Sequence, residues 1–150
     1  MSRLSSARPK IADYPFTTLE PNLGIVKVSE NASFVMADIP GLIEGAHNGK
    51  GLGHDFLKHI QRTRILLFLI DISSRNIYRD FEILLKEISC FNKDMLRKPI
   101  IIALNKIDIV QNKRILVSKF TNHPPVLKIS AVTGKGIPCL LSKLSKYVFR

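Results

Sequence analysis

Short apolar runs alternate along this chain with longer segments in which apolar residues recur every three or four positions. Five runs predict strands, over residues 24–28, 33–37, 65–71, 100–104 and 126–129. Two stretches, 65–70 and 100–104, are apolar at every position, which is typical of strands covered on both faces. This alternation predicts an α/β fold built in layers.

The segments between the runs predict helices. Residues 53–63, 77–95 and 138–149 carry apolar side chains at helical spacing, and residues 113–120 do so more weakly. Because strands and helices alternate from residue 65 onward, we expect parallel strands joined by right-handed crossovers. The first two strands are separated only by a short polar turn at 29–32, so they predict an antiparallel hairpin at the edge of the sheet.

Composition narrows the class of protein. The chain has 150 residues, of which 45% are hydrophobic and 23% charged, so it suits one globular domain and excludes disordered and collagen-like classes. Two widely separated cysteines argue against a disulfide scaffold and a structural zinc site. The longest apolar run, 65–70, is far too short to cross a bilayer, so we expect no membrane span. So few cysteines also favour a reducing compartment, and we expect a cytoplasmic protein.

Charge is unevenly distributed. The net charge is +11, and residues 109–150 contain eight Lys and Arg but no Asp or Glu. A segment of one sign is a candidate surface for a polyanion such as RNA. The alternative is that these lysines and arginines are ordinary solvent-exposed residues on the surfaces of helices and bind no polyanion.

The most specific motif is Asn105-Lys106-Ile107-Asp108, directly after the strand at 100–104. Guanine presents an N1–H and an exocyclic amine side by side, and the Asp108 carboxylate can accept from both. The aliphatic stem of Lys106 can cover the plane of the base, and Asn105 can brace neighbouring loops. The alternative is a polar loop in which Asp108 caps a helix.

Three weaker motifs also follow strands or precede the hairpin. In Asp38-Ile39-Pro40-Gly41, the carboxylate can hold a hydrated Mg²⁺ and the glycine N–H can approach a terminal phosphate. A threonine in the segment 14–19 can offer its hydroxyl to the metal, and Ser130-Ala131-Val132 can bring a backbone N–H to the guanine carbonyl. Each alone is no more than a turn or a surface loop. Together, in this order, they indicate a guanine-nucleotide-binding domain.

Four segments, 5–19, 37–47, 51–53 and 56–60, closely resemble the Obg family of GTPases, and the resemblance runs from about Leu4 to the C-terminus. It implies a P-loop NTPase-like three-layer α/β sandwich, with a mostly parallel sheet and one antiparallel edge hairpin. It also implies Mg²⁺-dependent binding and slow hydrolysis of GTP. The implied partners are GTP, GDP and the rRNA and protein of the large ribosomal subunit, whose assembly the family serves. We expect a monomer.

The resemblance also assigns residues to the nucleotide. Thr18 and Asp38 would contact Mg²⁺, Asp38 through water. The residues expected to bind GTP are Phe16, Thr17, Thr18, Leu19, Glu20, Asp38, Ile39, Pro40, Gly41, Asn105, Lys106, Ile107, Asp108, Ser130, Ala131 and Val132. No catalytic residue is assigned, since Leu42 stands where Ras-like proteins have the glutamine that orients water.

The chain departs from the family at one point, because no segment matches the Walker A pattern G-x-x-x-x-G-K-[ST]. The glycines around Lys50 have the wrong spacing, and Gly51 follows the lysine where Ser or Thr is required. We therefore expect residues 1–150 to form an Obg-type G domain truncated at its N-terminus, without its first strand and P-loop. The alternative is a remnant that binds no nucleotide and acts only as a basic RNA-binding or ribosome-binding module.

Overall fold

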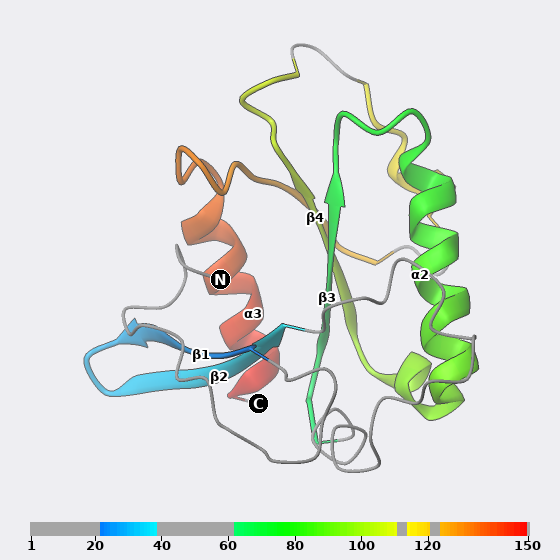
Figure 1. Ribbon diagram of the computed structural model, residues 1–150. Coiled ribbons are helices and arrows are strands. Elements are labelled where there is room, and N and C mark those ends of the chain that lie inside the picture. The colour runs from blue at the N-terminus through cyan, green and yellow to red at the C-terminus, as the bar shows by residue number, and fades with distance from the viewer. Residues whose placement is uncertain (1–21, 39–61, 111–113, 121–123, 150) are drawn as a thin grey trace. The chain divides into compact units, whose positions relative to one another are not determined.

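The computed structural model describes residues 22–38, 62–110, 114–120 and 124–149 (Figure 1). The chain divides into two compact units, Met1–Thr63 and Arg64–Arg150. The described strands form a two-stranded sheet in the first unit and a three-stranded sheet in the second.

The first unit contains the predicted antiparallel hairpin, which forms a two-stranded sheet of its own among the described strands and is not hydrogen-bonded to the parallel sheet as an edge. Strand β1 (Asn22–Ser29) pairs with β2 (Ala32–Asp38) across a turn at Glu30 and Asn31. The pairing sets Ile25 opposite Val35, and both side chains are exposed. Asp38 is the last residue of β2, so the D-x-x-G motif begins where the strand ends.

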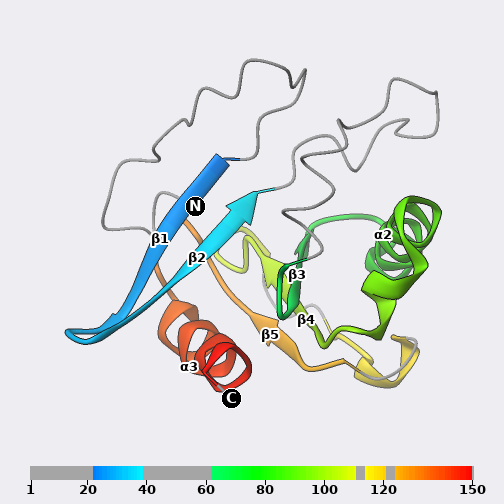
Figure 2. The ribbon, with the colours of Figure 1, turned by 90° about the horizontal axis from the view of Figure 1, so that it is seen from below.

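The second unit is a parallel sheet between two helices. Strands β3 (Leu66–Asp71), β4 (Ile100–Asn105) and β5 (Val126–Lys128) lie in that order and run parallel. Helices α2 (Ile77–Phe91) and α3 (Ile137–Val148) lie on opposite sides of this sheet (Figures 1 and 2). Two short 3-10 helices complete the unit, η1 (Lys93–Arg97) and η2 (Val117–Lys119). The predicted α/β arrangement with parallel strands is confirmed.

The core of this unit is apolar and includes a group of aromatic rings. Phe81 of α2 packs against Phe68 of β3 and Phe120, with ring centroids 5.7 and 5.3 Å apart. Strand β4 is the central strand, and its side chains from Ile101 to Leu104 are fully buried. On the other side of the sheet, α3 buries Ile137, Leu140 and Leu144. The central strand β4 is therefore covered on both faces, and its register with β3 and β5 is set by the backbone pairing of the strands.

The predicted helix over 77–95 is too long. Helix α2 ends at Phe91 because Asn92 adopts an extended backbone, with φ −160° and ψ 112°. The Asn92 side chain instead accepts a hydrogen bond from the Asp94 amide at 2.9 Å and caps η1. Met95 continues the apolar spacing of α2 and is buried, but it is held by η1. Periodicity alone missed this boundary because it ignores the cap.

Two further expectations need correction. The helix predicted over 113–120 is only the single 3-10 turn of η2 in the described residues, closed by the Lys119 amide, which donates to the Leu116 carbonyl at 3.1 Å. Strand β3 is not covered on both faces, since Leu69 is 55% exposed while its neighbours Phe68 and Ile70 are buried. The predicted helix at 53–63 lies largely outside the described residues, and Arg62 and Thr63 are not helical.

Candidate functional site

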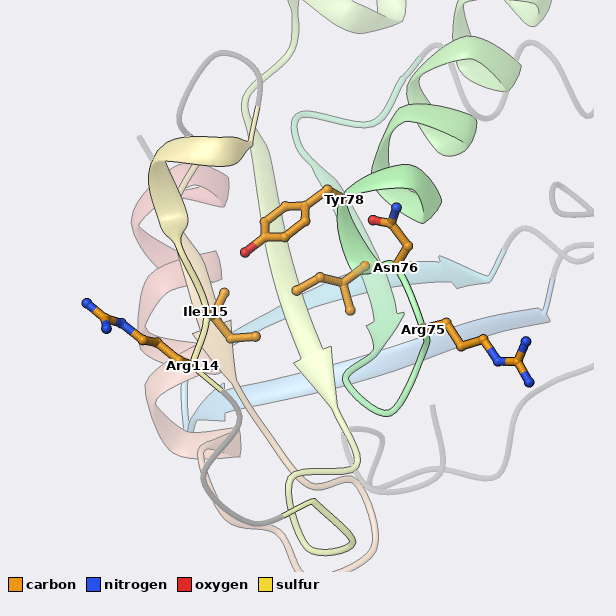
Figure 3. Close-up of a pocket in the computed structure, with 6 residues that line it drawn as sticks. Arg75, Asn76, Tyr78, Arg114 and Ile115 are labelled. Carbon is orange, nitrogen blue, oxygen red and sulfur yellow. The ribbon is translucent and has the colours of Figure 1, made fainter.

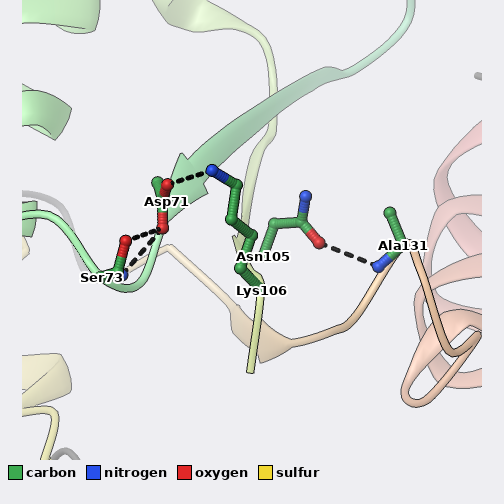
Figure 4. Close-up of polar contacts among 5 residues, drawn as sticks. All are labelled: Asp71, Ser73, Asn105, Lys106 and Ala131. Carbon is green, nitrogen blue, oxygen red and sulfur yellow. Dashed lines mark hydrogen bonds and ion pairs between the residues drawn. The ribbon is translucent and has the colours of Figure 1, made fainter. Parts of the chain in front are cut away.

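Two of the predicted motifs meet at the carboxyl ends of β4 and β5. Asn105 is the last residue of β4, and its side-chain oxygen accepts a hydrogen bond from the Ala131 amide at 2.9 Å (Figure 4). The two residues are 26 positions apart in the sequence and belong to loops that follow neighbouring parallel strands. The bond joins N-K-x-D to S-A-V at one edge of the sheet, where ligands of open α/β sheets commonly bind.

Ser130 makes the second loop rigid. Its side chain is fully buried, and its hydroxyl accepts from the Thr133 amide at 3.0 Å. Its amide donates to the Lys135 carbonyl, and its carbonyl accepts from the Gly134 amide, both at 2.9 Å. Ala131 is half-buried and Val132 is exposed. The loop therefore holds its shape through its own hydrogen bonds and presents residues 131 and 132 to the outside.

Lys106 has an unusual backbone and a fixed side chain. Its φ is +69°, in the left-handed region that non-glycine residues rarely adopt. Its ammonium group lies 2.6 Å from a carboxylate oxygen of Asp71, the last residue of β3 (Figure 4). The Lys106 carbonyl accepts from the Ile109 amide at 3.2 Å, which closes a turn immediately after the strand.

Asp71 is held from a second direction by Ser73. The Ser73 amide and hydroxyl both donate to the other carboxylate oxygen, at 2.8 and 2.7 Å. The hydrogen bonds from Lys106 and Ser73 lower the pKa of Asp71 from 3.8 to about 2, so this carboxylate is ionised at neutral pH. Neither Asp71 nor Ser73 was predicted as part of the site. No local sequence signal marks them, because Asp71 comes beside the N-K-x-D motif only through the parallel register that pairs it with Asn105.

Asp108 is the free acceptor of this group. It is exposed, its carboxylate has no hydrogen-bond or ion-pair partner within the described part of the chain, and it lies in the turn that follows β4. The preceding residue anchors this turn, because the Ile107 amide donates to the Ile129 carbonyl at 3.2 Å. The loop is thus fixed to β5 while the carboxylate remains available to a ligand.

Of the residues predicted to contact Mg²⁺ or the phosphates, only Asp38 is among the described residues. That residue is exposed at the end of β2 and belongs to the first unit. Residues 16–20, which include Thr18, and residues 39–41 lie outside the described residues. A single carboxylate with water ligands suits Mg²⁺, which is usually held by one or two carboxylates together with substrate phosphates.

A small pocket lies elsewhere in the second unit. Its volume is about 130 Å³, and it is lined by residues at the start of α2 and by Arg114 and Ile115 (Figure 3). The guanidinium groups of Arg75 and Arg114 extend from it in opposite directions. They do not converge on a common ligand position, so this pocket is not part of the predicted site.

None of the described helices is long and apolar enough to span a bilayer.

Comparison with known families decides the class of the chain. A family model described as "50S ribosome-binding GTPase" matches residues 1–106, more than half of the 150 residues. The chain belongs to this family. Proteins named GTPase Obg are similar to it over nearly its whole length, which confirms the resemblance found in the sequence.

The relatives are considerably longer than this chain. The GTPase Obg of Syntrophomonas wolfei is 52% identical over 149 residues, covering 95% of this chain and 35% of the relative. That of Chlorobium phaeobacteroides is 52% identical over 144 residues, covering 96% and 44%. That of Elusimicrobium minutum is 49% identical over 154 residues, covering 99% and 33%. The chain thus spans between a third and under half of the length of these relatives.

Solved structures support the fold. The G domain of the T. maritima FeoB iron transporter superposes with a TM-score of 0.66 at 24% identity, covering 98% of this chain and 87% of that domain. The cytosolic domain of the same transporter in apo form gives a TM-score of 0.65 at 20% identity, covering 98% and 56%. The expected P-loop type of α/β fold is confirmed.

Proposed function

We propose that this chain binds GTP and GDP and recognises guanine through Asn105-Lys106-Ile107-Asp108 and Ser130-Ala131-Val132. The observation that carries the proposal is the hydrogen bond from the Ala131 amide to the Asn105 side chain. This bond unites two motifs whose chemistry is complementary to one base. Membership of a GTPase family favours this function over the RNA-binding remnant that the sequence left open.

Each group has a part in reading the base. The free Asp108 carboxylate accepts from the guanine N1–H and exocyclic amine, and adenine has no such pair of donors. The aliphatic stem of Lys106 covers one face of the base. An amide in the Ser130–Val132 loop donates to the guanine carbonyl oxygen, while Asn105 holds the two loops together. Recognition therefore depends on distances that the β4–β5 pairing sets.

Mg²⁺ and the phosphates belong to the other motifs in this proposal. Thr18 would hold the metal and Asp38 would hold it through water, and the bound metal would neutralise charge on the phosphates. Residues 16–20 and the segment from Asp38 to Gly41 would contact the metal and the terminal phosphate. The 150 residues hold no Walker A sequence, so we propose that residues 1–150 form an Obg-type G domain lacking the first strand and P-loop.

The cellular role follows from the family. We propose slow, Mg²⁺-dependent hydrolysis of GTP linked to assembly of the large ribosomal subunit, in the cytoplasm and as a monomer. The family model is described as ribosome-binding, and the relatives are named GTPases. The acid-free segment from 109 to 150 supplies the positive charge that contact with rRNA requires.

The base-reading proposal is tested by nucleotide titration followed by NMR. The Ala131 and Ile107 amides are the reporters, and GDP, ADP and xanthosine diphosphate are added up to millimolar concentration. We expect GDP alone to shift them in the unmodified chain. Asp108→Asn exchanges an acceptor for a donor and should move the preference toward xanthine, with a loss for guanine of about 1–3 kcal/mol.

The control variant is Asp94→Asn, which removes an exposed carboxylate in η1. It should leave the titration unchanged. Equal shifts with ADP and GDP, or a preference for GDP that Asp108→Asn leaves unchanged, would contradict the assignment of residues 105–108.

A further inference from the structure

Asp71 occupies a distinctive place beside the proposed base-reading loop. It ends β3, pairs in register with Asn105 of β4, and contacts the next residue, Lys106, through an ion pair of 2.6 Å. Ser73 fixes the carboxylate with two hydrogen bonds from its amide and hydroxyl. The carboxylate thus bridges the ends of two neighbouring strands, and it contacts a residue of the N-K-x-D motif without belonging to that motif.

Lys106 needs such a partner. A lysine side chain has a flexible stem of four carbons and loses rotamer freedom when it is held in one position. The Lys106 side chain is 51% exposed, so packing alone does not define its path. Its left-handed backbone, with φ +69°, directs the side chain from an uncommon starting geometry. A fixed anion at the far end of the stem is what restricts it to one path.

We propose that Asp71 is a positioning residue for nucleotide recognition: by anchoring the Lys106 ammonium group, it holds the lysine stem in place as a platform for the base. Ser73 in turn holds Asp71. This inference rests on the proposed function for the identity of the ligand. The anchoring of Lys106 itself can be measured on the chain without nucleotide.

A second ion pair shows what an ordinary surface pair looks like. Arg97 and Asp94 lie 3.3 Å apart, both on η1, and their side chains are 85% and 74% exposed. The Asp71–Lys106 pair is shorter, less exposed and joins two strand ends, and Ser73 orients its acid. Asp94→Asn is therefore a matched control, because it removes one carboxylate from an ion pair that touches neither loop.

The first measurement is backbone and side-chain NMR relaxation of Lys106 in the nucleotide-free chain. We expect Asp71→Asn to increase the mobility of the Lys106 side chain and Asp71→Glu to restore part of its order. Asp94→Asn should leave Lys106 unchanged. A Lys106 side chain as ordered in Asp71→Asn as in the unmodified chain would overturn the inference, whatever the nucleotide affinity.

The second measurement is a double-mutant cycle in nucleotide affinity. Asp71→Asn should weaken GDP and inosine diphosphate by the same factor, about two- to fivefold, because a platform contacts both bases alike. In a Lys106→Met background the same substitution should have no further effect. Tighter binding by Asp71→Asn would show that the ion pair competes with nucleotide, and an additive cycle would show that Asp71 acts elsewhere; either result overturns the inference.

The two measurements separate this inference from the proposed function. If no guanine nucleotide binds, the proposed function fails, and the relaxation data still decide whether Asp71 anchors Lys106. If Asp108→Asn changes the ratio of GDP to inosine diphosphate affinity while Asp71→Asn leaves it unchanged, both proposals hold. A changed ratio in Asp71→Asn would contradict the platform role.

Discussion

Gly136 offers a stringent test of how the Ser130 loop is joined to α3. It precedes the first residue of α3 and has φ +78°. A Cβ built at this position would lie 2.3 Å from the Lys128 carbonyl oxygen and 3.2 Å from the Ile129 Cα. Both neighbours are backbone atoms, so they cannot move aside as a flexible side chain would. Gly136→Ala therefore forces β5 and the start of α3 apart.

The chain supplies its own control at Gly134. This residue has φ +84°, but a Cβ built there meets nothing within 4 Å. Gly134→Ala should cost only the left-handed backbone penalty, about 1–2 kcal/mol. Gly136→Ala carries the same penalty together with a backbone collision, so we expect a loss of about 3 kcal/mol or more, within the range of disruptive core substitutions.

Urea unfolding provides the measurement. The chain has three tyrosines and no tryptophan. Tyr78 and Tyr147 lie in α2 and α3 of the second unit and Tyr14 belongs to the first, so Tyr14→Phe is made in both variants and the remaining tyrosine fluorescence follows the second unit. We expect the midpoint for Gly136→Ala to fall well below that for Gly134→Ala. Equal midpoints would refute the close approach of Gly136 to Lys128. The Ala131 amide resonance should also move in Gly136→Ala, because the Lys135 carbonyl holds the Ser130 amide.

Three further predictions concern charge. Because the pKa of Asp71 is lowered, its stabilising contribution is complete above about pH 4 and is lost as pH falls toward 2. Solvent screening limits this contribution to about 1 kcal/mol or less. Urea unfolding across this pH range should show that Asp71→Asn removes the contribution. RNA binding by residues 109–150 should weaken steeply as salt is added. Lys143→Glu should reduce the slope of log affinity against log salt concentration by about 1, whereas Lys86→Glu on α2 should leave this slope unchanged. A flat slope would mean that these lysines make no phosphate contacts. Adding a strand–G-x-P-N-x-G-K-S-T–helix segment before the chain should tighten GTP binding by roughly three to six decades, because it adds three charge-assisted contacts of about 1.5–3 kcal/mol each. Titration with a fluorescent nucleotide measures this difference. Micromolar binding by the 150-residue chain alone would contradict the prediction.

Much of the second unit could be predicted from local pattern. Strand β4 is apolar at five positions because both its faces are covered, and the apolar run identifies it without further information. The N-K-x-D motif follows this strand directly, so its place at the carboxyl end of the sheet also follows. By contrast, the end of α2 depends on the Asn92 side chain, which accepts a hydrogen bond from the Asp94 amide. The spacing of hydrophobic residues carries no information about this bond.

The contacts that join distant segments could not be obtained in this way. Nothing in the sequence near Asp71 distinguishes it from a solvated strand end, and only the parallel register of β3 and β4 brings it to Lys106. Leu69 has the same apolar character as its neighbours, and only the packing of α2 on one face of β3 separates the buried Phe68 from the exposed Leu69.

The sequence by itself determined the α/β class, the parallel direction of the strands after residue 65 and the residue types that can read guanine, because hydrophobic period and motif spacing are local properties of the chain. The tertiary structure decided which of those residues meet. The Asn105–Ala131 hydrogen bond and the Lys106–Asp71 ion pair join residues 26 and 35 positions apart, and both arise because neighbouring parallel strands end at one edge of a sheet. Strand pairing is a non-local choice, so the geometry of the candidate site appears only when the sheet is assembled.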